Sequence, residues 1–146
     1  MFPDKIVDFI KEHHVLTLAV SDGSDIWCSH AFYTFVEDEL LFVITSDDKT
    51  RHISLINKNP GLVAGAICLE TETIGLIRGL QFKAVADKCD NSLTNRYRLK
   101  YLKRFPYAVL KGGELWTLRI TEAKFTDNRL GFGKKLLWNE NDGVVK

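Results

Sequence analysis

The chain has 146 residues, of which 45% are hydrophobic and 27% are charged. These proportions exclude disordered, collagen-like and coiled-coil chains, and the length predicts a single domain over residues 1–146. Twenty basic residues against nineteen acidic ones give a net charge of +1, which excludes a nucleic-acid binder that acts through bulk positive charge.

The first half of the chain predicts one helix, three strands and a second, short helix. Apolar residues at helical spacing predict a helix over residues 3–14. Alternating and β-rich runs predict a hairpin of residues 15–21 and 26–36 and a buried strand over residues 40–45. Residues 46–52 then form a loop that opens a short helix, which ends at Asn59-Pro60 because the residue before proline disfavours the α conformation.

The second half predicts further strands around one helix. Strands are expected over residues 62–69, 73–87 and 114–121, with a last strand pair within residues 124–138. Leu93, Tyr97 and Tyr101 recur every four residues and predict a helix that Pro106 ends. About six strands with short turns and three small helices are typical of a mainly β protein, an antiparallel barrel or sandwich.

The strand at residues 26–36 is apolar on both faces, whereas a strand on the surface of a single layer alternates cleanly. This pattern predicts that one face lies in the barrel and the other lies against a helix or a second subunit.

The location of the protein is predicted from its cysteines and its apolar runs. Cys28, Cys68 and Cys89 are odd in number and lack CxxC spacing, which is typical of free thiols in a reducing cytoplasm. No apolar run approaches the roughly 20 residues of a spanning helix, and the first residues lack a secretory pattern. The short apolar runs predict no membrane contact. Cys28 and His30 alone do not make a zinc site, so no metal is expected.

The segment from Thr45 to His52 is the richest in functional groups. It joins a strand end to a helix start and carries the hydroxyls of Thr45, Ser46 and Thr50, the guanidinium of Arg51 and the imidazole of His52. A helix N-terminus offers free N–H groups and a partial positive charge that favour phosphate, and arginine can bind phosphate bidentately. The alternative interpretation is an ordinary capped helix with a solvated, charged turn.

Two other features of the sequence each allow two interpretations. His30 lies on a predicted apolar strand face, where a lone histidine is more often a core or interface residue than a catalyst, and the same caution covers Gln81. No acid occurs between Asp90 and Glu114, and this stretch is either a grip for an anionic ligand or a solvated helix face. Its basic residues are Arg96, Arg98, Lys100, Lys103 and Arg104.

The order of these segments resembles the pyridoxamine 5'-phosphate oxidase-like FMN-binding split-barrel superfamily, and within it the small bacterial YhbP-like branch. The most distinctive motifs are WCSHAFY at residues 27–33, KTRH at 49–52, IRGLQFK at 77–83 and KFTDNRLGFGKK at 124–135. The resemblance implies a six-stranded antiparallel split β-barrel with short flanking helices. It also implies a homodimer with FMN in the groove between the subunits.

The resemblance further implies which residues hold the cofactor. Thr50, Arg51 and His52, with Thr45 and Ser46 before them, would hold the FMN phosphate. Gln81 would reach the edge of the isoalloxazine ring, along which lies the stretch His30, Ala31, Phe32, Tyr33 and Thr34.

The chain departs from the oxidases of the superfamily at several of these places. It has His30 and Phe35 where they carry arginine and lysine, and His52 replaces a lysine. The Arg-Leu-His run of the oxidases is absent after Trp138, so pyridoxamine-phosphate oxidation is not expected. Whether the segment with Lys134, Lys135 and Trp138 reaches the partner's site is left open.

Three functions follow as hypotheses. The first is a flavin-dependent oxidoreductase that acts on an unassigned small molecule. The second is a flavin- or haem-binding protein without turnover, in which His30 or His52 could bind iron. The third is a cofactor-free dimeric interaction module.

Overall fold

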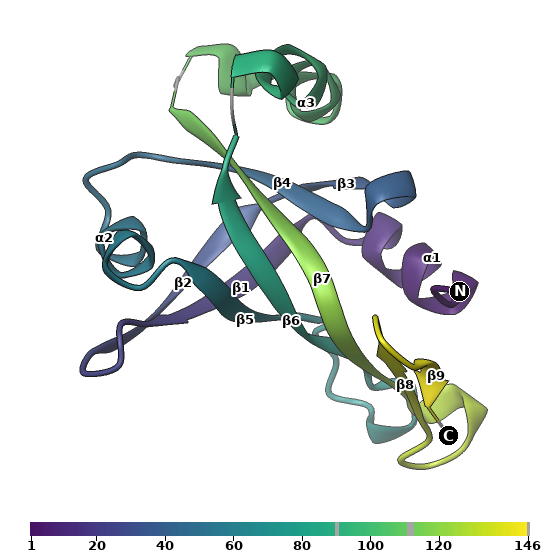
Figure 1. Cartoon of the computed structure of the whole chain (residues 1–146). Coiled ribbons are helices and arrows are strands. Elements are labelled where there is room, and N and C mark those ends of the chain that lie inside the picture. The colour runs from purple at the N-terminus through teal and green to yellow at the C-terminus, as the bar shows by residue number, and fades with distance from the viewer. Residues whose placement is uncertain (90, 111–112, 146) are drawn as a thin grey trace.

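The computed structural model describes residues 1–89, 91–110 and 113–145, and within them the chain forms three α-helices and one antiparallel sheet of nine strands (Figure 1). The helices are α1 (Asp4–Glu12), α2 (Arg51–Lys58) and α3 (Asn91–Arg104). The strands are β1 (Val15–Ser21), β2 (Ile26–Phe32), β3 (Thr34–Val36), β4 (Leu41–Ser46), β5 (Gly61–Cys68), β6 (Arg78–Lys88), β7 (Glu114–Asp127), β8 (Lys135–Asn139) and β9 (Gly143–Val145). The sequence offers Asp90, Asn91 and Ser92 as N-caps of the third helix, and Asp90 lies outside the described residues.

The sheet curls into a half-barrel because one predicted strand divides into two. The main path of the sheet runs β2-β1-β5-β6-β7-β4-β3, so β2 and β3 stand at its opposite ends although only Tyr33 separates them in the chain. At that break the backbone N–H of Tyr33 donates to the carbonyl of His14, and the Tyr33 hydroxyl donates to the carbonyl of Ile10 at 2.5 Å. The prediction of one continuous strand over residues 26–36 is therefore wrong, since the buried Tyr33 ring redirects the chain across the barrel.

The strand count also differs from the prediction of six. Residues 26–36 form two strands instead of one. The strand pair expected within residues 124–138 is formed by the end of β7 and by β8, and β9 is a further strand beyond it. The first half of β7 pairs with β4 and its second half pairs with β8, which lets one strand serve two parts of the sheet. Mainly β structure with a few short helices is confirmed.

The core fills the inside of the curled sheet. Helix α1 contributes Ile6, Phe9 and Ile10, which pack with inward residues such as Leu18 and Phe42 of the strands. A second cluster, in which Tyr97 and Tyr101 of α3 cover Val36 and Leu41, buries the outer side of β3 and β4. The sequence predicted that residues 26–36 are buried on both faces. At β3 this holds, because helix α3 covers the outer face, whereas one face of β2 is not covered.

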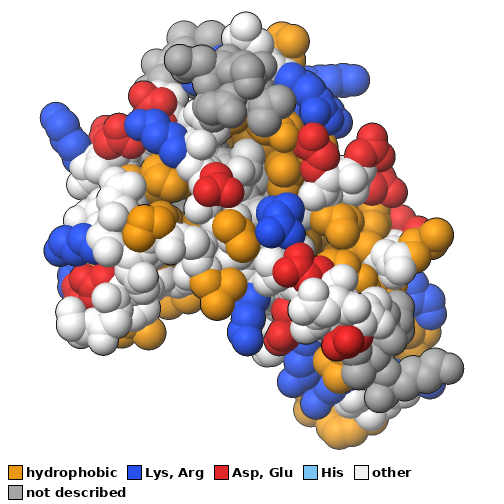
Figure 2. Space-filling view, viewed as in Figure 1, with side chains coloured by type: hydrophobic (Ala, Val, Ile, Leu, Met, Phe, Trp, Pro, Cys, Tyr) orange, Lys and Arg blue, Asp and Glu red, His pale blue; other side chains and the backbone are white. Residues whose placement is uncertain are grey.

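The surface carries no segregation of charge on the face seen in Figure 2, where acidic, basic and hydrophobic side chains of the described residues are interspersed. Among the described residues, none of the helices has the length and apolarity that crossing a membrane requires.

Candidate functional site

The start of helix α2 gathers three of the predicted site residues. Ser46, the last residue of β4, places its hydroxyl 2.6 Å from His52 Nε2 and 3.4 Å from Thr50 Oγ1. Thr50 is the N-cap of α2: its Oγ1 accepts from the backbone N–H of Ile53 at 3.4 Å and donates to the carbonyl of Asp47 at 2.9 Å. We call Ser46, Thr50 and His52 the hydroxyl–imidazole cluster.

Burial sets the electrostatics of this cluster. Ser46 is 9% exposed and His52 is half-buried, and this desolvation lowers the pKa of His52 below its usual 6.5. At pH 7 the His52 ring is therefore mainly neutral, and its tautomer decides whether Nε2 donates to the Ser46 hydroxyl or accepts from it. Because the neutral imidazole carries no charge, the positive end of the α2 dipole is the feature of the cluster that attracts an anion at pH 7.

Thr45 and Arg51 lie beside the cluster but outside it. Thr45 faces α3, where its hydroxyl donates to the Tyr101 hydroxyl at 3.4 Å. Arg51 turns toward the β1–β2 hairpin, donates to Asp25 Oδ2 at 2.9 Å and lies 4.0 Å over the ring of Trp27. The guanidinium that the sequence assigned to a phosphate is thus held by an acid and an indole of a distant strand turn.

His30 and Gln81 lie together on another surface, the outer face of the half-barrel. Strand register puts His30 opposite Thr17, Thr17 opposite Ala66 and Ala66 opposite Gln81, so the four form one row across β2, β1, β5 and β6. His30 Nδ1 lies 3.1 Å from Thr17 Oγ1, and the His30 and Gln81 side chains are both exposed. The neighbour of the cluster, Arg51, contacts Trp27, and the Trp27 side chain lies on the face of β2 opposite to that of His30. Within one chain, His30 therefore does not reach the hydroxyl–imidazole cluster.

The remaining residues of the predicted ring-side stretch point in different directions. Ala31 packs against the core, Phe32 is exposed with its ring centroid 5.3 Å from that of Phe105, and Thr34 is buried. Tyr33 is fully buried, which raises the pKa of its hydroxyl, and its carbonyl accepts from Arg104 Nη1 at 2.9 Å. Only the outward residues of this stretch are available to a ligand on the outer face.

The basic stretch on α3 and the C-terminal segment with Lys134, Lys135 and Trp138, both left open by the sequence, are partly engaged in contacts within the fold. On α3, Arg96 pairs with Glu39 at 3.0 Å, and Arg104 donates to the carbonyls of Tyr33 and His13, so this helix is fastened to the barrel by its cations. In the C-terminal segment Trp138 is buried with its ring centroid 4.9 Å from that of Phe2, while Lys134 and Lys135 are exposed.

Sequence reasoning missed Thr17, Asp25 and Trp27 as neighbours of the predicted residues. Their contacts join residues that are 13 or more positions apart, and no spacing within a short motif could have indicated them. Among the described residues there is no group of three or more histidine, cysteine or acidic side chains that could hold a metal ion.

Comparison with known proteins gives relatives by sequence and neighbours by fold. No family model matches the chain. The chain is 38% identical over 136 residues to the UPF0306 protein YhbP of Escherichia coli, which covers 93% of this chain and 92% of that protein. It is also 38% identical over 131 residues to a UPF0306 protein of Yersinia pseudotuberculosis, over 90% of this chain and 88% of that protein.

Solved structures with the same fold include proteins named for haem and for a flavin. A heme-binding protein from Mycobacterium smegmatis aligns with a TM-score of 0.75 and 17% identity, over 90% of this chain and 55% of that chain. The heme storage protein HutZ from Vibrio cholerae aligns with a TM-score of 0.69 and 20% identity, over 82% of this chain and 91% of that chain. An FAD-binding protein from Mesorhizobium loti aligns with a TM-score of 0.67 and 9% identity, over 84% and 92% of the two chains. At these identities the likeness concerns the split-barrel fold alone.

Proposed function

The chain belongs to the UPF0306 family, and we propose that it is a homodimeric split-barrel protein that binds FMN, with the flavin phosphate at the hydroxyl–imidazole cluster. The observation that carries this proposal is the convergence of Ser46, Thr50 and His52 on the N-terminus of α2. A shared fold with haem- and flavin-binding proteins supports a cofactor of this size.

The cluster has the groups that a phosphate monoester needs. The Ser46 hydroxyl and the His52 imidazole can donate hydrogen bonds to phosphate oxygens, and backbone N–H groups of the first helical turn can add further donors. The chain has no glycine-rich fingerprint of the kind that spans a pyrophosphate, so a mononucleotide fits better than FAD. FMN, when bound, would supply the redox chemistry, and the chain's own residues would bind and orient it.

The second subunit completes the proposed site from the outer face. Ile26 and Leu62, 71% and 60% exposed, flank small residues of β1 and β5 and line a groove of about 250 Å³. Exposed large apolar side chains of this kind are typical of the apolar core of an obligate interface. A second copy on this face would bring its own residues toward the row of His30 and Gln81. Oxidoreduction of a small molecule by the bound flavin is the activity that we propose for this arrangement.

The test compares three flavins on the same protein. Quenching of flavin fluorescence should give tighter binding for FMN than for riboflavin or FAD, and Ser46→Ala should weaken FMN binding while leaving riboflavin binding unchanged. Thr121→Ala, a change in β7 away from α2, serves as the matched control. Equal affinity for riboflavin and FMN would overturn the phosphate assignment.

A second candidate ligand is haem, for which His30 is the specific observation. Its ring is exposed, and the contact of Nδ1 with Thr17 fixes the ring while Nε2 has no hydrogen-bond partner among the described residues. A neutral imidazole held in this way is a suitable iron ligand. Titration with hemin should give a shifted Soret band that His30→Ala abolishes and His14→Ala preserves, whereas an unchanged spectrum in His30→Ala excludes His30 as the ligand.

A further inference from the structure

A small charged cleft lies at the other side of the molecule from the outer-face groove, between α1 and the ends of β6 and β7. Its volume is about 180 Å³, and its floor is formed by the rings of Phe9 and Phe125, whose centroids are 5.1 Å apart. Arg78 begins β6 and lies opposite Asp127, the last residue of β7, so strand register places both at the cleft. None of these residues belongs to the proposed flavin site.

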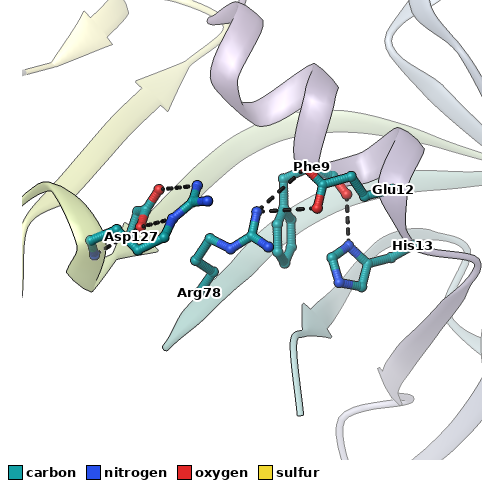
Figure 3. A network of polar contacts seen from close by, with 6 residues as sticks. Phe9, Glu12, His13, Arg78 and Asp127 are labelled. Atoms are coloured by element: carbon teal, nitrogen blue, oxygen red, sulfur yellow. Dashed lines mark hydrogen bonds and ion pairs between the residues drawn. The ribbon is translucent and has the colours of Figure 1, made fainter. Parts of the chain in front are cut away.

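Two carboxylates of the cleft, those of Asp127 and Glu12, are already paired with arginines. Asp127, 4% exposed, accepts from Arg129 Nε at 3.0 Å and from Nη2 at 2.9 Å, and these bonds hold the pKa of Asp127 below its usual value. Glu12 accepts from Arg78 Nη1 at 3.1 Å and 3.4 Å. Figure 3 shows Arg78 between Asp127 and Glu12, with its guanidinium beside the ring of Phe9.

The donors of the cleft, in contrast, are only partly used. Arg78 Nε is buried and has no hydrogen-bond partner, and no partner is found for Nη2 among the described residues either. Lys5 also lines the cleft, and it makes no ion pair within the described part of the chain. A buried arginine N–H without an acceptor is energetically unfavourable, so an acceptor that enters the cleft is favoured.

We propose that this cleft binds the carboxylate group of a small organic acid, with one or both carboxylate oxygens on the Nε–Nη2 edge of Arg78 and the hydrocarbon part on Phe9 and Phe125. The planar guanidinium edge matches a carboxylate in geometry. The Glu12 side chain is half exposed, so the guanidinium can pivot toward the cleft without stranding a buried acid.

The charge and the size of the cleft narrow the ligand class. Three cations, Lys5, Arg78 and Arg129, face three anions, Asp8, Glu12 and Asp127, which gives a formal sum of zero and disfavours a dianion such as phosphate. The volume is well below the roughly 300 Å³ at which drug-sized sites begin, so only a few heavy atoms fit. An amino acid would share this chemistry, because Asp8 could receive its ammonium group.

The experiment follows the Nε–H resonance of Arg78 by NMR in the full chain. The signal is assigned by its loss in Arg78→Lys, and butyrate is expected to move it downfield in a saturable way, whereas butylamine leaves it unchanged. 4-Aminobutyrate tests the amino-acid source: tighter binding than butyrate assigns an amino acid, and weaker or equal binding assigns a simple acid.

Two variants complete the test. Arg78→Lys keeps the charge but removes the planar edge, and should weaken butyrate binding about tenfold, measured on backbone amide shifts of Phe9 and Phe125. The control is Arg119→Lys, which alters an exposed arginine on β7 that pairs with Glu140. This variant should leave butyrate binding unchanged. A wild-type Nε–H signal that butyrate does not move, or that phosphate moves equally, overturns the proposal, and neither result bears on FMN binding at α2.

Discussion

Arg51 donates a 2.9 Å hydrogen bond to Asp25 and lies over Trp27, although it is the residue next to both Thr50 and His52. The hydrogen bond also lowers the pKa of Asp25, so this carboxylate stays ionised and keeps its hold on the guanidinium near neutral pH. A phosphate at the hydroxyl–imidazole cluster would have to compete with Asp25 for Arg51. The ion pair is exposed, and exposed pairs contribute little to stability, so the exchange is within reach of a dianionic ligand.

The first prediction concerns this competition. Arg51→Ala should weaken FMN binding by about 1.5–3 kcal/mol, the range for a hydrogen bond to a charged group, and Asp25→Asn should strengthen it because the guanidinium is released. Fluorescence titration of FMN with both variants measures the two effects. Lys49→Ala is the control, since it removes an exposed cation of the same loop without touching the cluster. Wild-type affinity in Arg51→Ala would place the phosphate away from Arg51.

The second prediction concerns pH. Only the imidazolium form of His52 attracts phosphate by charge, and burial lowers the pKa of His52 in the free protein, so the contribution of His52 to FMN affinity should rise as the pH falls toward this lowered pKa. The phosphate's own second pKa near ~6 acts in the opposite direction. Titrations between pH 5 and 8 should therefore be compared with His52→Gln, in which only the phosphate titrates. Parallel pH profiles for the two proteins would show that His52 carries no charge toward the ligand.

The third prediction concerns packing between β5 and β6. Gly65 lies opposite Phe82, and a Cβ atom at Gly65 would meet Phe82 Cζ at 2.3 Å and the carbonyl oxygen of Thr17 at 2.8 Å. Gly65→Ala should lower the free energy of unfolding by about 1–3 kcal/mol, because the buried ring and the neighbouring backbone must both move. Urea denaturation measures this loss. Gly75→Ala, where a Cβ meets no atom within 4 Å, should change stability by no more than about 0.5 kcal/mol.

The fourth prediction concerns the second subunit. Leu62→Asp puts a charge into the exposed groove on the outer face and should convert the proposed dimer into a folded monomer, since the leucine is not part of the core of one chain. Sedimentation velocity measures the change in mass. Leu99→Asp, on a leucine of α3 that is also largely exposed, should leave the dimer intact. A wild-type protein that sediments as a stable monomer would remove the basis for a shared site.

The sequence by itself determined the elements whose causes are local. The helix at α1, the turn that Asp22 closes with the backbone N–H groups of Ser24 and Asp25, and the Thr50 cap of α2 all depend on residues a few positions apart. Periodicity and capping chemistry record such contacts directly, and so the loop from Thr45 to His52 could be recognised as a helix start with convergent hydroxyls.

Only the tertiary structure decided how these pieces combine. The division of residues 26–36 at Tyr33 depends on a hydrogen bond to Ile10, 23 positions away, and the partner of Arg51 lies 26 positions away. The row from His30 to Gln81 needs the register of four strands, and the Arg78–Glu12 contact joins residues 66 positions apart. Strand register and sheet curvature arise from the packing of the whole core, because a strand's own residues fix which side chains alternate but not which neighbours they meet.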